Sequence, residues 1–99
     1  MILVLGEFEF HPDDFQAASA LATTLMRETV KEDGCMKYVF AVDLARSNCL
    51  QLSECWRDDR ALSAHFLTPH IQAYREGLKA LRVVRRVVKR YDVTGSSDL

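Results

Sequence analysis

Residues 54–74 read ECWRDDRALSAHFLTPHIQAY and contain most of the side chains that could take part in chemistry. The stretch predicts a strand that ends near Trp56 and two short helices after it. The first helix is expected over about residues 58–66, because paired aspartates are favoured caps. The second begins at Thr68 and Pro69, since proline is well tolerated in the first helical turn. A strand followed by two helices in succession places this stretch at one end of a sheet.

Before this stretch, the sequence predicts one strand, a helix and a two-stranded hairpin. Residues 2–10 alternate in the manner of a half-buried strand, and apolar residues recur at helical spacing from about residue 13 to residue 33. Gly34 suits the left-handed conformation that closes a helix. Residues 36–42 and 50–57 then alternate as two strands joined by a short polar turn. These two strands are expected to pair as a hairpin.

After the last helix, residues 83–93 carry valines that fit either a helix or a strand, and the density of β-branched side chains favours a strand. The predicted order is therefore β-α-β-β-α-β, a ferredoxin-like α+β fold with helices on one face of an antiparallel sheet. We expect one domain over residues 1–93 and a mobile tail over residues 94–99. The uncovered face would be apolar whichever set of strand residues it shows, so we expect a homodimer packed sheet to sheet.

Composition narrows the classes of partner. The 99 residues carry 13 basic and 14 acidic side chains, for a formal net charge of −1, so no bulk field favours nucleic acid or a membrane surface. No run approaches the roughly 20 apolar residues of a membrane span, and the short apolar start lacks a basic leader. We therefore expect a cytoplasmic protein. Three unpatterned cysteines predict free thiols, not a disulfide framework.

Three motifs together resemble a known family. They are Glu32-Asp33-Gly34-Cys35, Glu54-x-Trp56, and the run from Asp59 through His65 to Thr68-Pro69-His70. This pattern resembles the antibiotic biosynthesis monooxygenase superfamily, particularly its small members similar to quinol monooxygenases. The resemblance implies a dimeric α+β barrel with a pocket between helices and sheet. It also implies oxidation of an electron-rich aromatic, such as a hydroquinone or polyphenol, by O2 without metal or flavin.

Within that resemblance, His65 is the first candidate for the base that deprotonates the substrate, because histidine titrates near neutral pH. A histidine that only bonds across the helix junction is the alternative. Glu54, the one carboxylate on an apolar strand face, is either functional or paired with Arg75 or Arg85. His70 lies in a first helical turn, where it could help to hold an anionic substrate or serve only as a cap.

Three aromatic residues are candidates for substrate binding. Trp56 and Tyr74 could stack on an aromatic ring, and Tyr38 could donate a hydroxyl hydrogen bond, although each could equally be part of the core. No metal site is expected, because His65 and His70, five residues apart, straddle a helix break and no further histidine is near them in sequence. The predicted partners are thus a second copy of the chain, an aromatic substrate and O2.

Two other functions remain open at this stage. The His-x-x-Thr-Pro-His pattern also resembles a branch that processes a phosphorylated autoinducer-2 sugar, so an isomerase-like enzyme is possible. The arginine-rich segment 82–90 could then supply cations for a phosphate. A non-catalytic module that binds a small ligand is the second alternative, because a fold does not imply a function. An open apolar cavity beside His65, Trp56 and Tyr74 would favour the enzyme.

Overall fold

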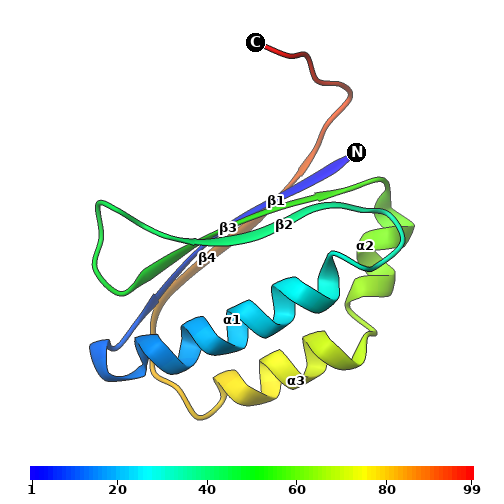
Figure 1. Ribbon diagram of the computed structural model, residues 1–99. Helices are drawn as coiled ribbons and strands as arrows, with labels where there is room; N and C mark the ends of the chain where they lie inside the picture. The colour runs from blue at the N-terminus through cyan, green and yellow to red at the C-terminus, as the bar shows by residue number, and fades with distance from the viewer.

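The computed structural model describes residues 1–99 and contains four strands, three α-helices and one 3-10 turn (Figure 1). The elements, in chain order, are β1 (Ile2–Phe10), η1 (Pro12–Asp14), α1 (Phe15–Thr29), β2 (Cys35–Val42), β3 (Cys49–Trp56), α2 (Asp59–His65), α3 (Pro69–Leu78) and β4 (Val83–Asp92). The predicted order is confirmed, including the strand at the C-terminal end.

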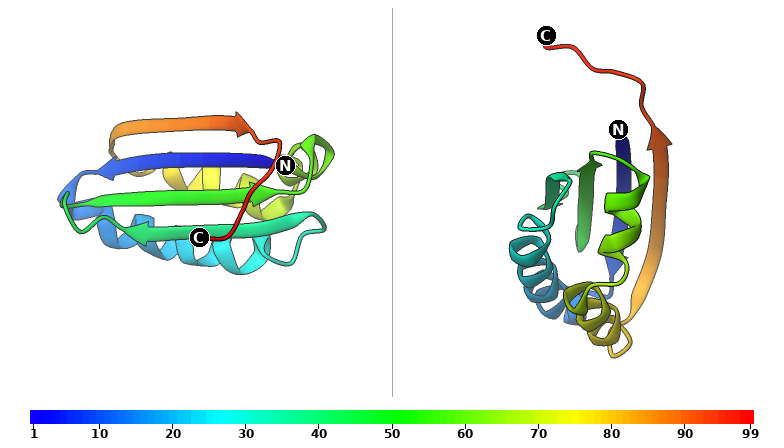
Figure 2. Two further views of the ribbon diagram at one scale, coloured as in Figure 1. Left: turned by 90° about the horizontal axis from the view of Figure 1, so that it is seen from above. Right: turned by 90° about the vertical axis from the view of Figure 1, so that its right-hand side faces the viewer.

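The four strands form one antiparallel sheet in the order β2-β3-β1-β4. Figure 2 shows all helices on one side of this sheet, with the other side bare. This is the ferredoxin-like arrangement that the sequence predicts. The sheet curves around the helices, and α3 lies beneath β1 and β4 (Figure 2).

The first helix is shorter than predicted. It ends at Thr29, not near Asp33, and residues 30–34 form successive turns that lead into β2. Gly34 does adopt the left-handed conformation, with φ +84°, but it closes these turns and not the helix itself. Its backbone also lies against α2, because a Cβ at Gly34 would stand 2.5 Å from the Cβ of Ala61. Absence of a side chain here lets the turn approach α2.

The core lies between the sheet and the helices. Residues of even number in β1 and β3 face the helices, and Leu50, Leu52, Glu54 and Trp56 are all buried. The sequence left open which face of β3 would be covered, and the structure places this set inside. From α1, the predicted apolar stripe packs on them through Ala18, Ala22 and Leu25.

The alternation predicted for β2 is interrupted at its start. The register shifts between Cys35 and Lys37, where a bulge inserts an extra residue. Met36 is therefore on the uncovered face, with its sulfur 3.9 Å from the sulfur of Cys55, and not on the buried side with Tyr38. A strict alternation over residues 36–42 would put Met36 on the same side as Tyr38, and the bulge reverses the side on which it lies.

The bare face of the sheet is partly apolar. Leu5, Val39, Val87 and Tyr91 are each between 37% and 46% exposed on it. The segment after β4 projects away on this same side (Figure 1). No helix in the structure is long and apolar enough to cross a membrane.

Candidate functional site

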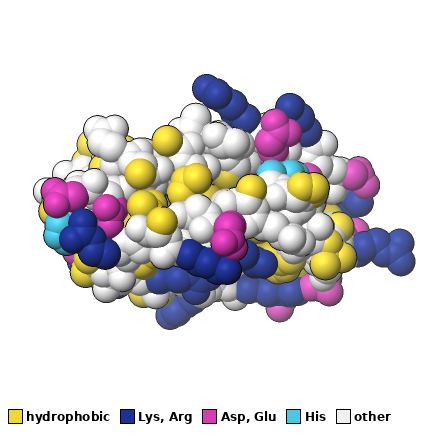
Figure 3. Space-filling model, turned by 90° about the horizontal axis from the view of Figure 1, so that it is seen from below, with side chains coloured by type: hydrophobic (Ala, Val, Ile, Leu, Met, Phe, Trp, Pro, Cys, Tyr) yellow, Lys and Arg dark blue, Asp and Glu magenta, His cyan; other side chains and the backbone are white.

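A cavity of about 170 Å³ lies between the sheet and α3. Ten of its fourteen lining residues are hydrophobic, and they come from all four strands and α3 together with the residue after α2. The four remaining lining residues are Glu54, His65, Arg75 and Arg86. Figure 3, which views the helix side, shows hydrophobic atoms exposed among polar ones, with Lys and Arg atoms along the lower edge and at several other places around the rim. An apolar cavity with a few titratable groups is the usual form of a small-molecule site.

Glu54 is the buried carboxyl group of this cavity. It lies on β3 and is only 6% exposed, and its Oε1 accepts a hydrogen bond of 2.8 Å from Nε1 of Trp56. Burial raises the pKa of Glu54 to about 7, against the smaller opposing effect of the Trp56 hydrogen bond. A carboxyl group with such a pKa can both release and accept a proton at neutral pH.

The ion pair considered for Glu54 was wrong. Arg85 bonds instead to Glu7, at 2.6 Å on the other face of the sheet. The guanidinium carbon of Arg75 lies 5.3 Å from the centre of the Phe66 ring. Glu54 therefore has an indole N–H as its partner and no balancing cation within the ion-pair distance, which leaves the functional interpretation of this residue standing.

His65 ends α2 and is 1% exposed. Its ring packs 4.9 Å from the Trp56 ring and 5.4 Å from the Tyr38 ring, measured between ring centres. Its Nδ1 lies 2.7 Å from Oε2 of Glu32, and burial lowers the pKa of His65 while the Glu32 carboxylate acts in the opposite direction. A carboxylate only accepts hydrogen bonds, so Nδ1 carries the proton and the neutral ring keeps a lone pair on Nε2.

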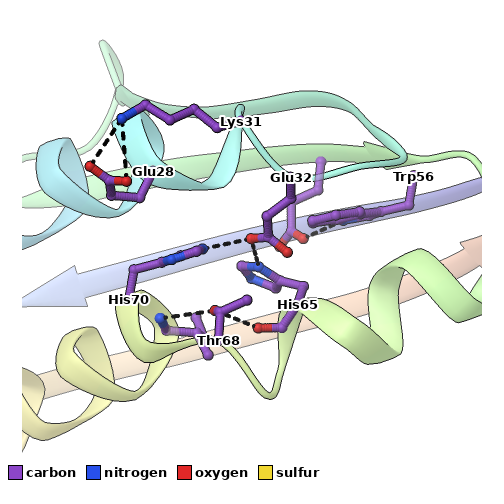
Figure 4. A network of polar contacts seen from close by, with 9 residues as sticks. Glu28, Lys31, Glu32, Trp56, His65, Thr68 and His70 are labelled. Carbon is purple, nitrogen blue, oxygen red and sulfur yellow. Dashed lines mark hydrogen bonds and ion pairs between the residues drawn. The ribbon is translucent and has the colours of Figure 1, made fainter.

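Glu32 is the functional candidate that sequence reasoning missed. The same Oε2 also lies 2.7 Å from Nε2 of His70, so one carboxylate oxygen holds both histidines (Figure 4). The three residues come from the turn after α1, the end of α2 and the start of α3. Glu32 appeared in the sequence only as part of a family motif, because contacts across 33 and 38 positions have no periodic signal.

The break between α2 and α3 positions both histidines. The hydroxyl of Thr68 donates a hydrogen bond of 2.8 Å to the backbone carbonyl of His65 and accepts one from the amide of Ile71. The first bond ties Thr68 to the end of α2, and the second caps α3, as predicted. Figure 4 shows the resulting network. The Thr-Pro turn thus sets the angle at which His65 and His70 approach Glu32.

The aromatic candidates and His70 take different places. Tyr38 and Tyr74 line the cavity, and burial raises both pKa values, that of Tyr74 to about 12, so both hydroxyls stay protonated at neutral pH. Trp56 is fully buried and does not line the cavity; it supports Glu54 and His65 from behind. His70 lies outside the cavity, facing Glu32 and a hollow between α1 and α3. Because neither residue lines the cavity, Trp56 is not placed to stack on a ligand there and His70 is not placed to bind an anion there.

Glu32, His65 and His70 are also a possible ligand set for a metal ion. Their ligand atoms lie within 4.8 Å of one another, so the carboxylate of Glu32 completes a ligand cluster that the search for a further histidine did not find. Two imidazoles and a carboxylate suit several divalent transition metals. The same atoms are joined to one another by hydrogen bonds in the structure, which satisfies their polar groups without an ion.

The cysteines do not contribute to the site. All three are free thiols, as predicted, and Cys49 and Cys55 are buried. Burial raises the pKa of Cys35 to about 11 and also raises that of Cys49, which keeps both as thiols near neutral pH.

Comparison with known proteins gives the family. The family model described as antibiotic biosynthesis monooxygenase matches residues 1–77. An uncharacterized protein of Synechocystis sp. is 30% identical over 98 residues, which cover 99% of this chain and 67% of that protein. YgiN of Escherichia coli K12, named "Probable quinol monooxygenase", is 29% identical over 89 residues, covering 80% of this chain and 86% of YgiN.

Solved structures agree in fold. Rv0793 from Mycobacterium tuberculosis superposes with a TM-score of 0.88 at 27% identity, covering 98% of each chain. A Deinococcus radiodurans protein assigned to the antibiotic biosynthesis monooxygenases gives a TM-score of 0.92 at 21% identity over all of this chain and 98% of that one. Because the family model matches most of its length, the chain belongs to the antibiotic biosynthesis monooxygenase family.

Proposed function

We propose that this protein is a cofactor-independent monooxygenase that oxidises an electron-rich aromatic of the hydroquinone type with O2. The observation that carries the proposal is the apolar cavity that contains both Glu54, with a pKa of about 7, and His65, whose ring is oriented by Glu32. The cavity volume of about 170 Å³ is close to that of apolar protein cavities of about 150 Å³ that take up benzene, so one aromatic ring fits.

In the proposed reaction, the substrate supplies every electron. His65 accepts a proton from a phenolic hydroxyl through its free ring nitrogen, and the phenolate then transfers an electron to O2. The two radicals recombine to form a C–O bond at the ring, which gives a hydroperoxide. His65 returns its proton to the peroxide. Cleavage of the O–O bond then places a proton from Glu54 on the leaving hydroxide, which departs as water, while the same ring carbon loses its C–H proton to the Glu54 carboxylate and becomes a carbonyl. One oxygen atom enters the product as a hydroxyquinone, the other leaves as water, and the ring has lost four electrons.

Each group has a defined task in this scheme. Glu32 holds the His65 ring so that its proton-accepting nitrogen is the one not bonded to the carboxylate, as an aspartate does in a catalytic triad. The protonated hydroxyls of Tyr38 and Tyr74 can donate hydrogen bonds to the developing phenolate. The apolar lining keeps water away from the radical pair and the peroxide.

Oxygen uptake tests the proposal. Purified protein checked for bound metal is supplied with hydroquinone and substituted polyphenols, and spontaneous autoxidation is subtracted. We expect saturable uptake that His65→Gln and Glu54→Gln each reduce by about 100-fold, in the range typical for loss of general acid–base catalysis. His11→Gln is the matched control, because His11 directly follows β1, lies outside the cavity, and its ring contacts only Asp13.

Absence of enzyme-dependent uptake from folded protein on every substrate would refute the oxygenase. If both site variants keep full activity, the protein is still an oxygenase, but His65 and Glu54 are not its catalytic residues. The phosphosugar alternative receives less support, since three of the four arginines of segment 82–90, namely Arg82, Arg85 and Arg90, are each paired with a carboxylate, and only Arg86 lines the cavity.

We further propose that the bare sheet face mediates homodimerisation. The support is its four partly exposed apolar side chains, since exposed apolar patches commonly mark interfaces. Val39→Lys combined with Val87→Lys should shift the mass measured by light scattering from dimer to monomer. Leu44→Lys is the control, because Leu44 is fully exposed in the loop between β2 and β3. A monomeric wild-type protein would overturn this proposal.

A further inference from the structure

Two arginines at the cavity have no carboxylate partner. Of the nine arginines in the chain, five form ion pairs, namely Arg46, Arg57, Arg82, Arg85 and Arg90. The other four are Arg27, Arg60, Arg75 and Arg86. Arg75 and Arg86 both line the apolar cavity beside Glu54 and His65, and they come from two consecutive elements, α3 and β4. Unpaired guanidinium groups from two elements therefore meet at one cavity.

Both side chains are held in place by aromatic rings of the same cavity. The guanidinium carbon of Arg75 lies 5.3 Å from the centre of the Phe66 ring, and that of Arg86 lies 5.8 Å from the centre of the Phe8 ring. Cation–π contacts of this kind restrict the guanidinium while leaving its N–H donors unoccupied. Each arginine is thus partly ordered before any ligand arrives, which lowers the entropy cost of binding.

These cations lie close to the groups assigned to chemistry. The charge of Arg75 contributes to lowering the pKa of His65, and the charge of Arg86 acts to lower that of Tyr74. A ligand ring beside His65 and Tyr74 would therefore have a guanidinium within reach of a substituent. Guanidinium groups bind carboxylates and phosphates through paired, charge-assisted hydrogen bonds.

We propose that the substrate carries an anionic substituent, and that Arg75 and Arg86 bind it at the mouth of the cavity while the aromatic ring occupies the apolar interior. The class is an aromatic acid with hydroquinone character, in which a carboxylate is attached to the ring. This inference rests on the proposed function for the fate of the ring, but the binding of the anion stands on its own observations. Arg75 and Arg86 determine specificity in this account, and neither takes part in proton or electron transfer.

Binding without turnover is the first test. Under anaerobic conditions, 2,5-dihydroxybenzoate, its methyl ester and hydroquinone are titrated into the full chain by calorimetry at fixed pH and salt. We expect the carboxylate to bind at least about tenfold more tightly than either neutral compound, because each charge-assisted hydrogen bond is worth about that factor. Arg75→Gln and Arg86→Gln should each remove most of this preference. Arg27→Gln, the same charge change away from the cavity, should leave it intact.

Two further measurements distinguish failure of the proposed anion site from failure of the proposed oxygenase activity. Glycerol 3-phosphate tests an aliphatic anion, and binding as tight as that of 2,5-dihydroxybenzoate would overturn the aromatic class. Equal binding of acid and ester would overturn the anion site. In aerobic assays, oxidation of hydroquinone with no preference for the acid would refute this inference and keep the oxygenase. Selective binding of the acid that depends on both arginines, but without oxygen uptake, would keep the inference and refute the oxygenase.

Discussion

Replacement of Glu54 by Gln removes the titration of the only fully buried carboxyl group in the chain and keeps its shape. The amide oxygen of Gln can still accept the Trp56 hydrogen bond of 2.8 Å. Folding raises the pKa of Glu54 from 4.5 to about 7, and each pH unit of such a change corresponds to about 1.4 kcal/mol. Ionisation of this group in the folded protein therefore costs about 3 kcal/mol in total.

The sign of the effect follows from proton uptake. Because the folded state holds the Glu54 proton more tightly than the unfolded state, this group stabilises the fold below pH 4.5, and the contribution is lost as the pH rises through 7. Between pH 5 and pH 8.5 the wild-type protein should lose about 2 to 3 kcal/mol relative to Glu54→Gln. The two proteins should differ least at pH 5, where the folded wild type has a neutral side chain at this position.

Urea unfolding at a series of pH values measures this difference. Trp56 is the only tryptophan and is fully buried, so its fluorescence reports unfolding directly. Protein concentration is held constant, since dimerisation would add to the apparent stability. Glu76→Gln is the control, because Glu76 is exposed and pairs only with Lys79. A stability difference that stays constant with pH, or grows toward acid, would refute the assignment of Glu54 as a proton-binding group near neutrality.

Three further predictions concern the supports of the site. Gly34→Ala should lower the free energy of unfolding by about 2 kcal/mol or more in urea titrations, because it adds a Cβ at φ +84° and 2.5 Å from Ala61; an unchanged midpoint would contradict the close approach. Asp58→Ala should cost about 1 kcal/mol through loss of the cap on the Ala61 amide, with Asp58→Asn retaining most of it. Glu32→Gln should lower the pKa of His65 in an NMR titration, since the carboxylate favours the protonated ring; a rise would show that Glu32 does not hold it.

Much of the fold was predictable because it depends on local patterns. Residues adjacent in sequence are enough to predict the alternation of β1 and β3 and the Thr-Pro start of α3. The structure confirms these predictions. Two features were not predictable from local patterns. The end of α1 depends on the turn that brings Gly34 against α2, and the side on which Met36 lies depends on a bulge in β2. Both are set by contacts between elements.

The candidate site, like the fold, was predictable from the sequence only in part. The sequence alone predicts the strand and helix order, the family resemblance, and the candidate residues of the stretch 54–74, including Glu54 and His65. Only the tertiary structure decided that Glu32 binds both histidines, that Trp56 supports the site from behind, and that Arg75 and Arg86 meet at the cavity. The physical reason is that periodicity reports which face of an element is buried, whereas hydrogen bonds and charge pairing depend on distances between elements far apart in the chain.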